Sequence, residues 1–163
     1  MDIFDDDDDP ATRQDYDTVE VDIQVDAPIE AVWTLVSEPG WWINDGPLGD
    51  HEVEQDEDGL FHVSDPEVGT WLVERADLDP MDVAAFRWYP LAGDEFPEER
   101  TTRVEFSLSE QAGLVAVHVE EAGLSSVSPD EGVARQTWED AQGMWERELA
   151  AAKEHLEGTW ARR

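Results

Sequence analysis

The feature that most restricts the fold is a long amphipathic segment near the C-terminus. Between residues 129 and 157, apolar side chains recur at steps of three and four, the spacing of one face of an α-helix. The stripe consists of Ala134, Trp138, Ala141, Trp145, Leu149, Ala152 and Leu156. Ser128, Pro129 and Glu131 match a capping box, and Gly158 is expected to end the helix. About 28 residues would span roughly 42 Å, enough to lie across a whole β-sheet.

The segments before this helix are predicted to form such a sheet. In residues 19–25, valine and isoleucine alternate strictly with polar residues, which indicates a strand with one buried face. Turn sequences rich in Asp, Pro and Gly separate the later strands, and their short, regular spacing is typical of an antiparallel meander. The later strands are expected at 51–55, 60–64, 70–76, 83–89, 102–108 and 114–121.

Two short helical pieces are expected between the first strand and the meander. Pro28 suits the first position of a helix that ends before Pro39 and Gly40, and residues 41–43 are predicted to form another helical turn. The order is therefore β-α-α-β6-α, an α+β protein whose curved antiparallel sheet wraps around the C-terminal helix. We expect a disordered acidic tail at 1–17, one folded domain at 18–158 and a short tail at 159–163.

Charge excludes several classes of partner. Forty-two acidic residues against ten basic ones give a formal net charge of −32. Nucleic-acid binding needs clustered lysine and arginine, and anionic membranes would repel this chain. The acidic N-terminus does not resemble a signal peptide, and no apolar run could cross a bilayer, so a cytoplasmic protein is expected. The charge fits either a surface adapted to salt or a basic protein partner.

Such a charge predicts a stability that depends on salt. Repulsion among the carboxylates opposes the compact state, and the Debye length falls to about 3 Å at 1 M salt. The melting temperature should therefore rise as NaCl is increased from low concentration to 1 M. A flat or falling curve in a thermal-denaturation series would contradict this interpretation.

Several short motifs resemble a known family. Residues 27–35 followed by Trp41 and Trp42 look like the opening motif of the activator-of-Hsp90-ATPase-like branch of the START-related SRPBCC superfamily. Residues 69–74 and 86–88 look like its central strand pair, and 102–106, 117–124 and 145–156 complete the likeness over about 18–158. The resemblance implies a helix-grip fold with a ligand-sized cavity. Relatives include lipid and hormone binders, polyketide cyclases and co-chaperone domains.

Aromatic side chains are expected to surround the space between sheet and helix. The set comprises Trp33, Trp41, Trp42, Trp71, Phe86, Trp88, Phe106, Trp138 and Trp145. Either these rings simply fill the core, or they line a pocket for an apolar or aromatic ligand. Glu121 continues the inward face of its strand, where burial would raise its pKa and mark a functional candidate. Its candidate partners are Arg87 and Arg103, in a salt bridge or beside a ligand, and more weakly Arg135.

Motifs for catalysis and cofactors are missing from the sequence. Cysteine is absent, which excludes disulfides and thiolate chemistry, and the four histidines lack metal-ligand spacing. His118 is expected on the outer face of its strand. There is no GxSxG, GxGxxG or P-loop motif, so we expect no cofactor and no metal.

These observations favour non-catalytic binding of a small hydrophobic or aromatic molecule by a monomer or weak dimer. The ligand-binding residues would be the nine aromatic residues together with Glu121. A stress-related protein-interaction module, with a chaperone or other protein as partner, is the first alternative. The second is a small cyclase- or hydrolase-type enzyme, which would need an inward acid/base pair.

Overall fold

The computed structural model describes residues 16–44, 48–49, 51–93, 95–127 and 130–161. Most of the expected tail, together with the capping residues Ser128 and Pro129, lies outside these ranges. The main elements are β2 (Thr18–Val25), α1 (Ile29–Val36), β3 (Glu52–Gln55), β4 (Phe61–Asp65), β5 (Gly69–Asp79), β6 (Val83–Trp88), β7 (Thr102–Gln111), β8 (Leu114–Ala122) and α2 (Glu131–Ala161). Short 3-10 helices occupy η1 (Glu98–Arg100) and η2 (Leu124–Ser126).

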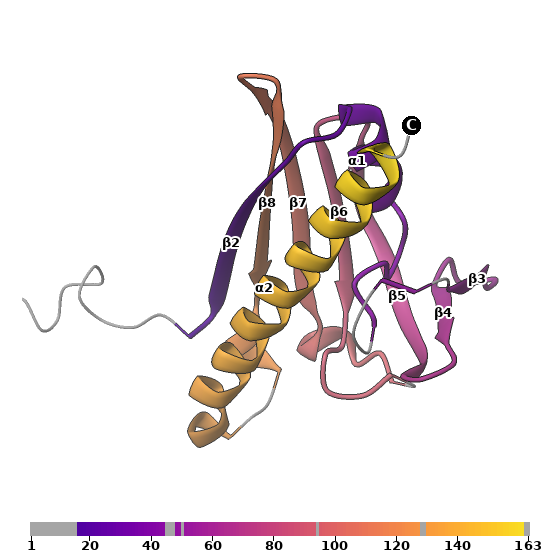
Figure 1. The fold of residues 1–163 in the computed structure, drawn as a ribbon. Coiled ribbons are helices and arrows are strands. Elements are labelled where there is room, and N and C mark those ends of the chain that lie inside the picture. Colours follow the sequence, from indigo (N-terminus) through magenta and orange to yellow (C-terminus); the bar gives the residue numbers. More distant parts are fainter. Residues whose placement is uncertain (1–15, 45–47, 50, 94, 128–129, 162–163) are drawn as a thin grey trace, which may run out of the picture.

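The strands form one antiparallel sheet in the order β2-β8-β7-β6-β5-β4-β3 (Figure 1). The meander of β3 to β8 follows chain order, and the first strand closes the far side by pairing Val21 with Val119. A register shift between Arg75 and Asp77 marks an irregularity where β5 bends against β6. The pairing continues past this shift, which is why β5 extends three residues beyond the predicted end at 76.

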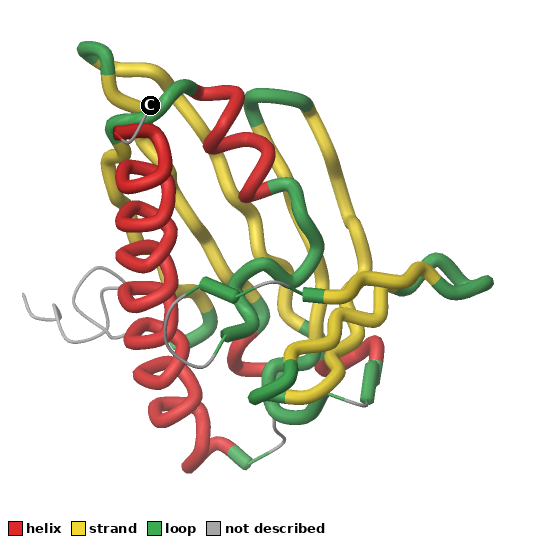
Figure 2. The backbone as a smooth tube through the Cα atoms, turned by 45° about the vertical axis from the view of Figure 1, so that its right-hand side comes forward, coloured by secondary structure: helices red, strands yellow, loops and turns green. Residues whose placement is uncertain are grey.

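Helix α2 lies across one face of the curved sheet, with α1 near its C-terminal end (Figures 1 and 2). Its predicted apolar stripe faces the sheet: Trp145 has no exposed surface, and Leu149 is 1% exposed. The alternating residues of β7 and β8 supply the opposite wall, since Val104, Phe106 and Val119 are fully buried. The predicted α+β arrangement, a bent sheet around a long helix, is confirmed.

Three predicted local features are wrong. Pro28 is the N-cap of α1, one position before the first helical residue. Residues 41–43 form reverse turns in place of a second helix, because Gly40 has a left-handed φ of 72° that interrupts the helical run. A Cβ on Gly40 would also lie 2.8 Å from Val63. Gly158 does not end α2, which continues to Ala161 without a left-handed residue at that position.

Candidate functional site

A cluster of aromatic rings occupies the centre of the space between sheet and helix. The cluster consists of Trp41, Trp42, Phe86, Phe106 and Trp145, with ring centroids 5.3 to 6.5 Å apart in contacting pairs. The geometries are tilted or edge-to-face, as the quadrupoles of aromatic rings prefer. Each ring is at most 1% exposed. Packing therefore accounts for the centre of the molecule.

Glu121 is embedded beside this cluster with no exposed surface. The Trp88 indole N–H and the Thr102 hydroxyl donate to Oε2 at 2.9 and 2.5 Å, and the Trp145 N–H donates to Oε1 at 2.8 Å. Burial raises the pKa of Glu121, and these three hydrogen bonds oppose the shift. A protonated carboxyl also fits, because the Thr102 hydroxyl can accept a hydrogen bond as well as donate one. The buried acid is thus held by neutral hydrogen-bond partners in either protonation state.

The predicted arginine partners of Glu121 are wrong. Arg87 donates to Thr101 at 3.1 Å, and Arg103 donates to Glu105 at 3.1 Å. Arg135 pairs with Glu139 on the surface of α2. The side chain of Arg103 is 39% exposed and that of Arg135 71%, so these guanidinium groups keep contact with water. Tryptophan N–H groups from the core satisfy the carboxyl because they reach it without burying a second charge.

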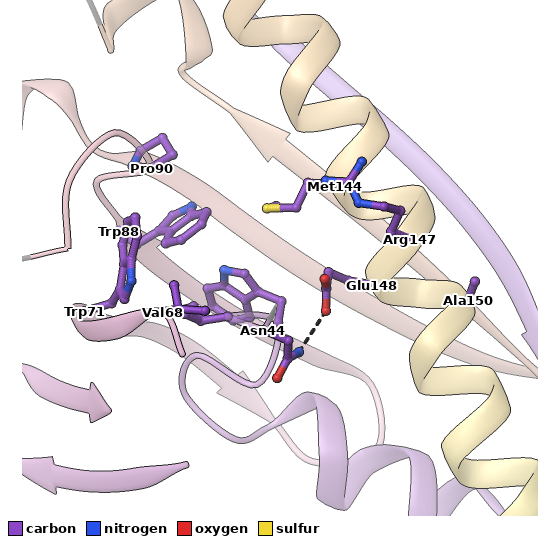
Figure 3. A pocket seen from close by; sticks show the side chains of 11 residues that line it. Asn44, Val68, Trp71, Trp88, Pro90, Met144, Arg147, Glu148 and Ala150 are labelled. Carbon is purple, nitrogen blue, oxygen red and sulfur yellow. Dashed lines mark hydrogen bonds between the residues drawn. The ribbon is translucent and has the colours of Figure 1, made fainter. Parts of the chain in front are cut away.

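A pocket of about 570 Å³ opens beside the aromatic cluster, between α2, the turn after α1 and the sheet (Figure 3). Its described lining consists of Trp42, Ile43, Asn44, Val68, Trp71, Trp88, Pro90, Met144, Arg147, Glu148 and Ala150. The Trp71 and Trp88 rings are tilted against each other with a centroid distance of 5.4 Å, and Trp42 meets Trp88 edge-to-face at 5.5 Å. A mostly apolar pocket with a few polar groups is the usual form of a small-molecule site.

Glu148 is the buried acid of this pocket. It is 5% exposed, and Oε1 accepts a hydrogen bond from Asn44 Nδ2 at 2.8 Å (Figure 3). Burial raises the pKa of Glu148 from 4.5 to about 7, against the opposing effects of the Asn44 hydrogen bond and the charge of Arg147. The carboxyl therefore changes charge close to neutral pH, inside a pocket walled by indoles.

Solved structures share this architecture at low sequence identity. The protein MLL2253 from Mesorhizobium loti is 20% identical, with a TM-score of 0.63 over 87% of this chain and 98% of that one. CalU16 from Micromonospora echinospora is 18% identical, with a TM-score of 0.59 over 86% and 74%. The Aha1 dimer from Colwellia psychrerythraea is 17% identical, with a TM-score of 0.54 over 86% and 96%. The chain shares the fold of these proteins, in which a curved antiparallel sheet wraps around a long C-terminal helix.

This likeness confirms the expected resemblance at the level of the fold. No protein-family model and no curated protein matches the sequence. Within the described residues, no helix is long and apolar enough to cross a membrane.

The helix-grip scaffold distributes the predicted site residues over different places. Trp42, Trp71 and Trp88 line the large pocket, and Trp88 also lines a second cavity of about 140 Å³ together with Glu121. Trp41 borders a third cavity of about 250 Å³, besides its place in the aromatic cluster. Phe86, Phe106 and Trp145 are buried in that cluster.

The remaining two predicted tryptophans lie elsewhere. Trp33 is buried on α1, at 9% exposure. Trp138 is only half-buried near the start of α2, where it contacts Tyr16 edge-to-face and donates to the Thr18 carbonyl at 2.8 Å. Trp138 therefore helps to hold the start of β2 against the helix.

Histidines do not contribute to the large pocket among the described residues. His118 lies on the outer face of β8 as predicted, where its ring nitrogens contact Asp22 at 2.6 Å and Glu20 at 3.1 Å. The described part of the chain holds no group of three or more His, Asp or Glu side chains that could bind a metal ion.

Sequence reasoning missed Glu148 and Asn44. Glu148 lies three residues after Trp145 and four before Ala152, so helical spacing alone places it on the buried side of α2. Helical spacing therefore predicts its burial. Because acidic residues are so frequent in this chain, however, their presence alone does not distinguish Glu148 as a functional residue. Asn44 carried no comparable signal, because its position depends on the turn set by Gly40.

Proposed function

We propose that this protein binds a small hydrophobic or aromatic molecule without transforming it, in the pocket lined by Trp42, Trp71 and Trp88. The observation that carries this proposal is an indole-walled pocket of about 570 Å³ beside the closely packed aromatic cluster. Burial of apolar ligand surface at roughly 25 cal/mol per Å² would drive binding. The proposed binding domain spans residues 18–158.

Residues that line the pocket favour binding over catalysis. Glu148 could exchange a proton near neutral pH, but the described lining offers no histidine as its acid or base partner. The second candidate function is a protein-interaction module, which the similarity in fold to the Aha1 dimer favours. Under that alternative the partner surface lies outside the pocket, and small molecules would have no effect.

A screen of fatty acids, sterols and flavonoids tests the proposal. A ligand should shift tryptophan emission, because three indoles line the pocket, and at 100 times its dissociation constant it should stabilise the fold by about 2.7 kcal/mol. Val68→Phe narrows the pocket and should weaken binding at least tenfold. Val53→Phe makes the same change at an exposed position on β3 and should leave the affinity unchanged.

Two results would contradict the proposal. The first is a screen in which no compound alters emission or melting temperature. The second is a ligand whose affinity is the same for Val68→Phe, Val53→Phe and the wild type, because such a ligand binds elsewhere.

A further inference from the structure

We infer that the pocket selects a flat apolar molecule carrying a protonated nitrogen, with Glu148 as the group that recognises the cation and the indole rings as its wall. This inference rests on the proposed function, since it names the ligand class for the same pocket. Four observations support it: the hydrogen bonds of the lining, the absence of a basic partner for Glu148 among the described residues, the aromatic faces and the charge of the whole chain.

The carboxyl of Glu148 lacks a donor on one oxygen, whereas the other unpartnered polar atom in the described lining, the Trp42 Nε1–H, is fully buried. Asn44 is already engaged on both sides of its amide: Nδ2 donates to the Trp41 carbonyl at 2.9 Å and to Glu148 Oε1 at 2.8 Å, and Oδ1 accepts from the Gly49 N–H at 3.1 Å. Among the described residues, Glu148 Oε2 has no hydrogen-bond partner. An ionised carboxylate only accepts hydrogen bonds, so a ligand that satisfies Oε2 must bring an N–H or O–H group.

Among the residues that the structure describes, Glu148 also has no positive neighbour in direct contact. No ion pair joins it to a basic side chain within the described ranges, although buried carboxylates are normally paired. Arg147, the residue before Glu148 on α2, is the only other charged side chain in the described lining. It is exposed, and its field lowers the pKa of Glu148. A ligand ammonium group would supply the close positive charge that the protein does not.

The aromatic lining suits a cation in the same place. Trp42, Trp71 and Trp88 border one pocket, with the Trp71 and Trp88 rings inclined at 43° and the Trp42 and Trp88 rings at 86°. Indole faces attract ammonium and guanidinium groups more strongly than other aromatic rings do, and the attraction grows when water is excluded. Rings that face the pocket at different inclinations can therefore contact both the flat body and the charged group of one ligand.

The charge of the whole chain favours the same ligand class. A formal net charge of −32 attracts cations and repels anions before any contact forms. A carboxylate or phosphate ligand would meet this repulsion and would also face Glu148 within the pocket. The single Arg147 at the pocket does not reverse that balance.

Three naphthalene probes with the same ring test the inference: 2-naphthylmethylamine, 2-naphthylmethanol and 2-naphthoate. At pH 8 and low salt, calorimetry should give at least tenfold tighter binding of the amine than of the alcohol, with the naphthoate weakest. Glu148→Gln should remove most of the advantage of the amine and weaken the alcohol much less, because the alcohol loses no charge pairing and glutamine keeps an acceptor for Asn44. Glu154→Gln, an exposed change of the same charge on α2, should preserve the advantage.

A second readout uses the wild-type protein alone. A cation beside Glu148 stabilises the carboxylate, and the pKa of about 7 means that roughly half of the molecules hold this proton at pH 7. Binding of the amine at pH 7 should therefore release up to about half a proton, measured from the heat of binding in buffers of different ionisation enthalpy. The alcohol should release none.

The outcomes separate the inference from the proposed function. If the alcohol or the naphthoate binds as tightly as the amine, or the amine releases no proton, the cationic ligand class is wrong while a binding pocket remains. If Val68→Phe abolishes binding of all three probes equally, the site is correct. The ratio of the wild-type affinities for the three probes then decides the ligand class. If none of the probes binds and the broader screen is also negative, the proposed function itself is overturned.

Discussion

Trp145→Ala is expected to lower the free energy of unfolding by about 3–5 kcal/mol, the range found for large aromatic residues removed from a core. The ring has no exposed surface, and it contacts Trp41, Trp42 and Phe106 with centroid distances of 6.5, 5.6 and 5.5 Å. The substitution also removes the N–H that donates to Glu121 Oε1, which leaves a buried acceptor without its donor. Urea denaturation followed by far-ultraviolet circular dichroism measures the loss without relying on tryptophan emission.

Trp138→Ala is the matched control on the same helix. Trp138 is half-buried and donates to the Thr18 carbonyl, so its removal loses less apolar contact and exposes that carbonyl to water. We expect a loss of about 1–2 kcal/mol. Equal losses for the two variants would show that the aromatic cluster around Trp145 is not the centre of the core.

Glu148→Gln is expected to stabilise the protein at alkaline pH and to change little at pH 4. In the folded state Glu148 holds its proton up to about pH 7, whereas in the unfolded state it releases it near 4.5. The wild type therefore loses stability as pH rises through this window, since the raised pKa favours the protonated form. The difference between the folded and unfolded pKa values corresponds to about 3 kcal/mol at pH 8. The free energy of unfolding of the variant should exceed that of the wild type by this amount.

The measurement is a set of urea denaturation curves from pH 4 to pH 8. Glu154→Gln removes the same charge from the exposed side of α2, so it reports the effect of net charge alone. The gain for Glu148→Gln should exceed that of Glu154→Gln and should grow between pH 4.5 and 7. A gain that is equal for the two variants, or constant with pH, would show that Glu148 titrates normally.

This prediction and the proposed ligand class are linked. The ionised carboxyl of Glu148 weakens the empty fold at neutral pH, whereas a bound cationic ligand would restore stability by pairing with its charge. Wild-type protein with bound 2-naphthylmethylamine should therefore gain more stability at pH 8 than Glu148→Gln with the same compound. Glu148 would thus lower the stability of the empty protein and make the pocket selective for cationic ligands.

Sequence periodicity determined the framework of this protein. The stripe through Trp145 and Leu149 set the position and buried face of α2, and alternation set the strands and the inward direction of Glu121. These patterns are readable because a side chain's direction depends on the helical or extended backbone within a few residues. Periodicity did not predict the ends of elements where a single residue redirects the backbone. Gly40, with its left-handed φ, is such a residue, and it prevents a helical turn at Trp41 and Trp42.

Only the tertiary structure decided how the chemistry is arranged. Glu121 takes its donors from β6, β7 and α2, and the Asn44–Glu148 hydrogen bond joins positions 104 residues apart. No local sequence pattern predicts which indole donates to which carboxyl. Nor does it predict whether the aromatic rings fill the core completely or leave a pocket beside them. Those outcomes depend on side-chain volumes meeting across the sheet and helix, so they emerge only when the distant segments are packed together.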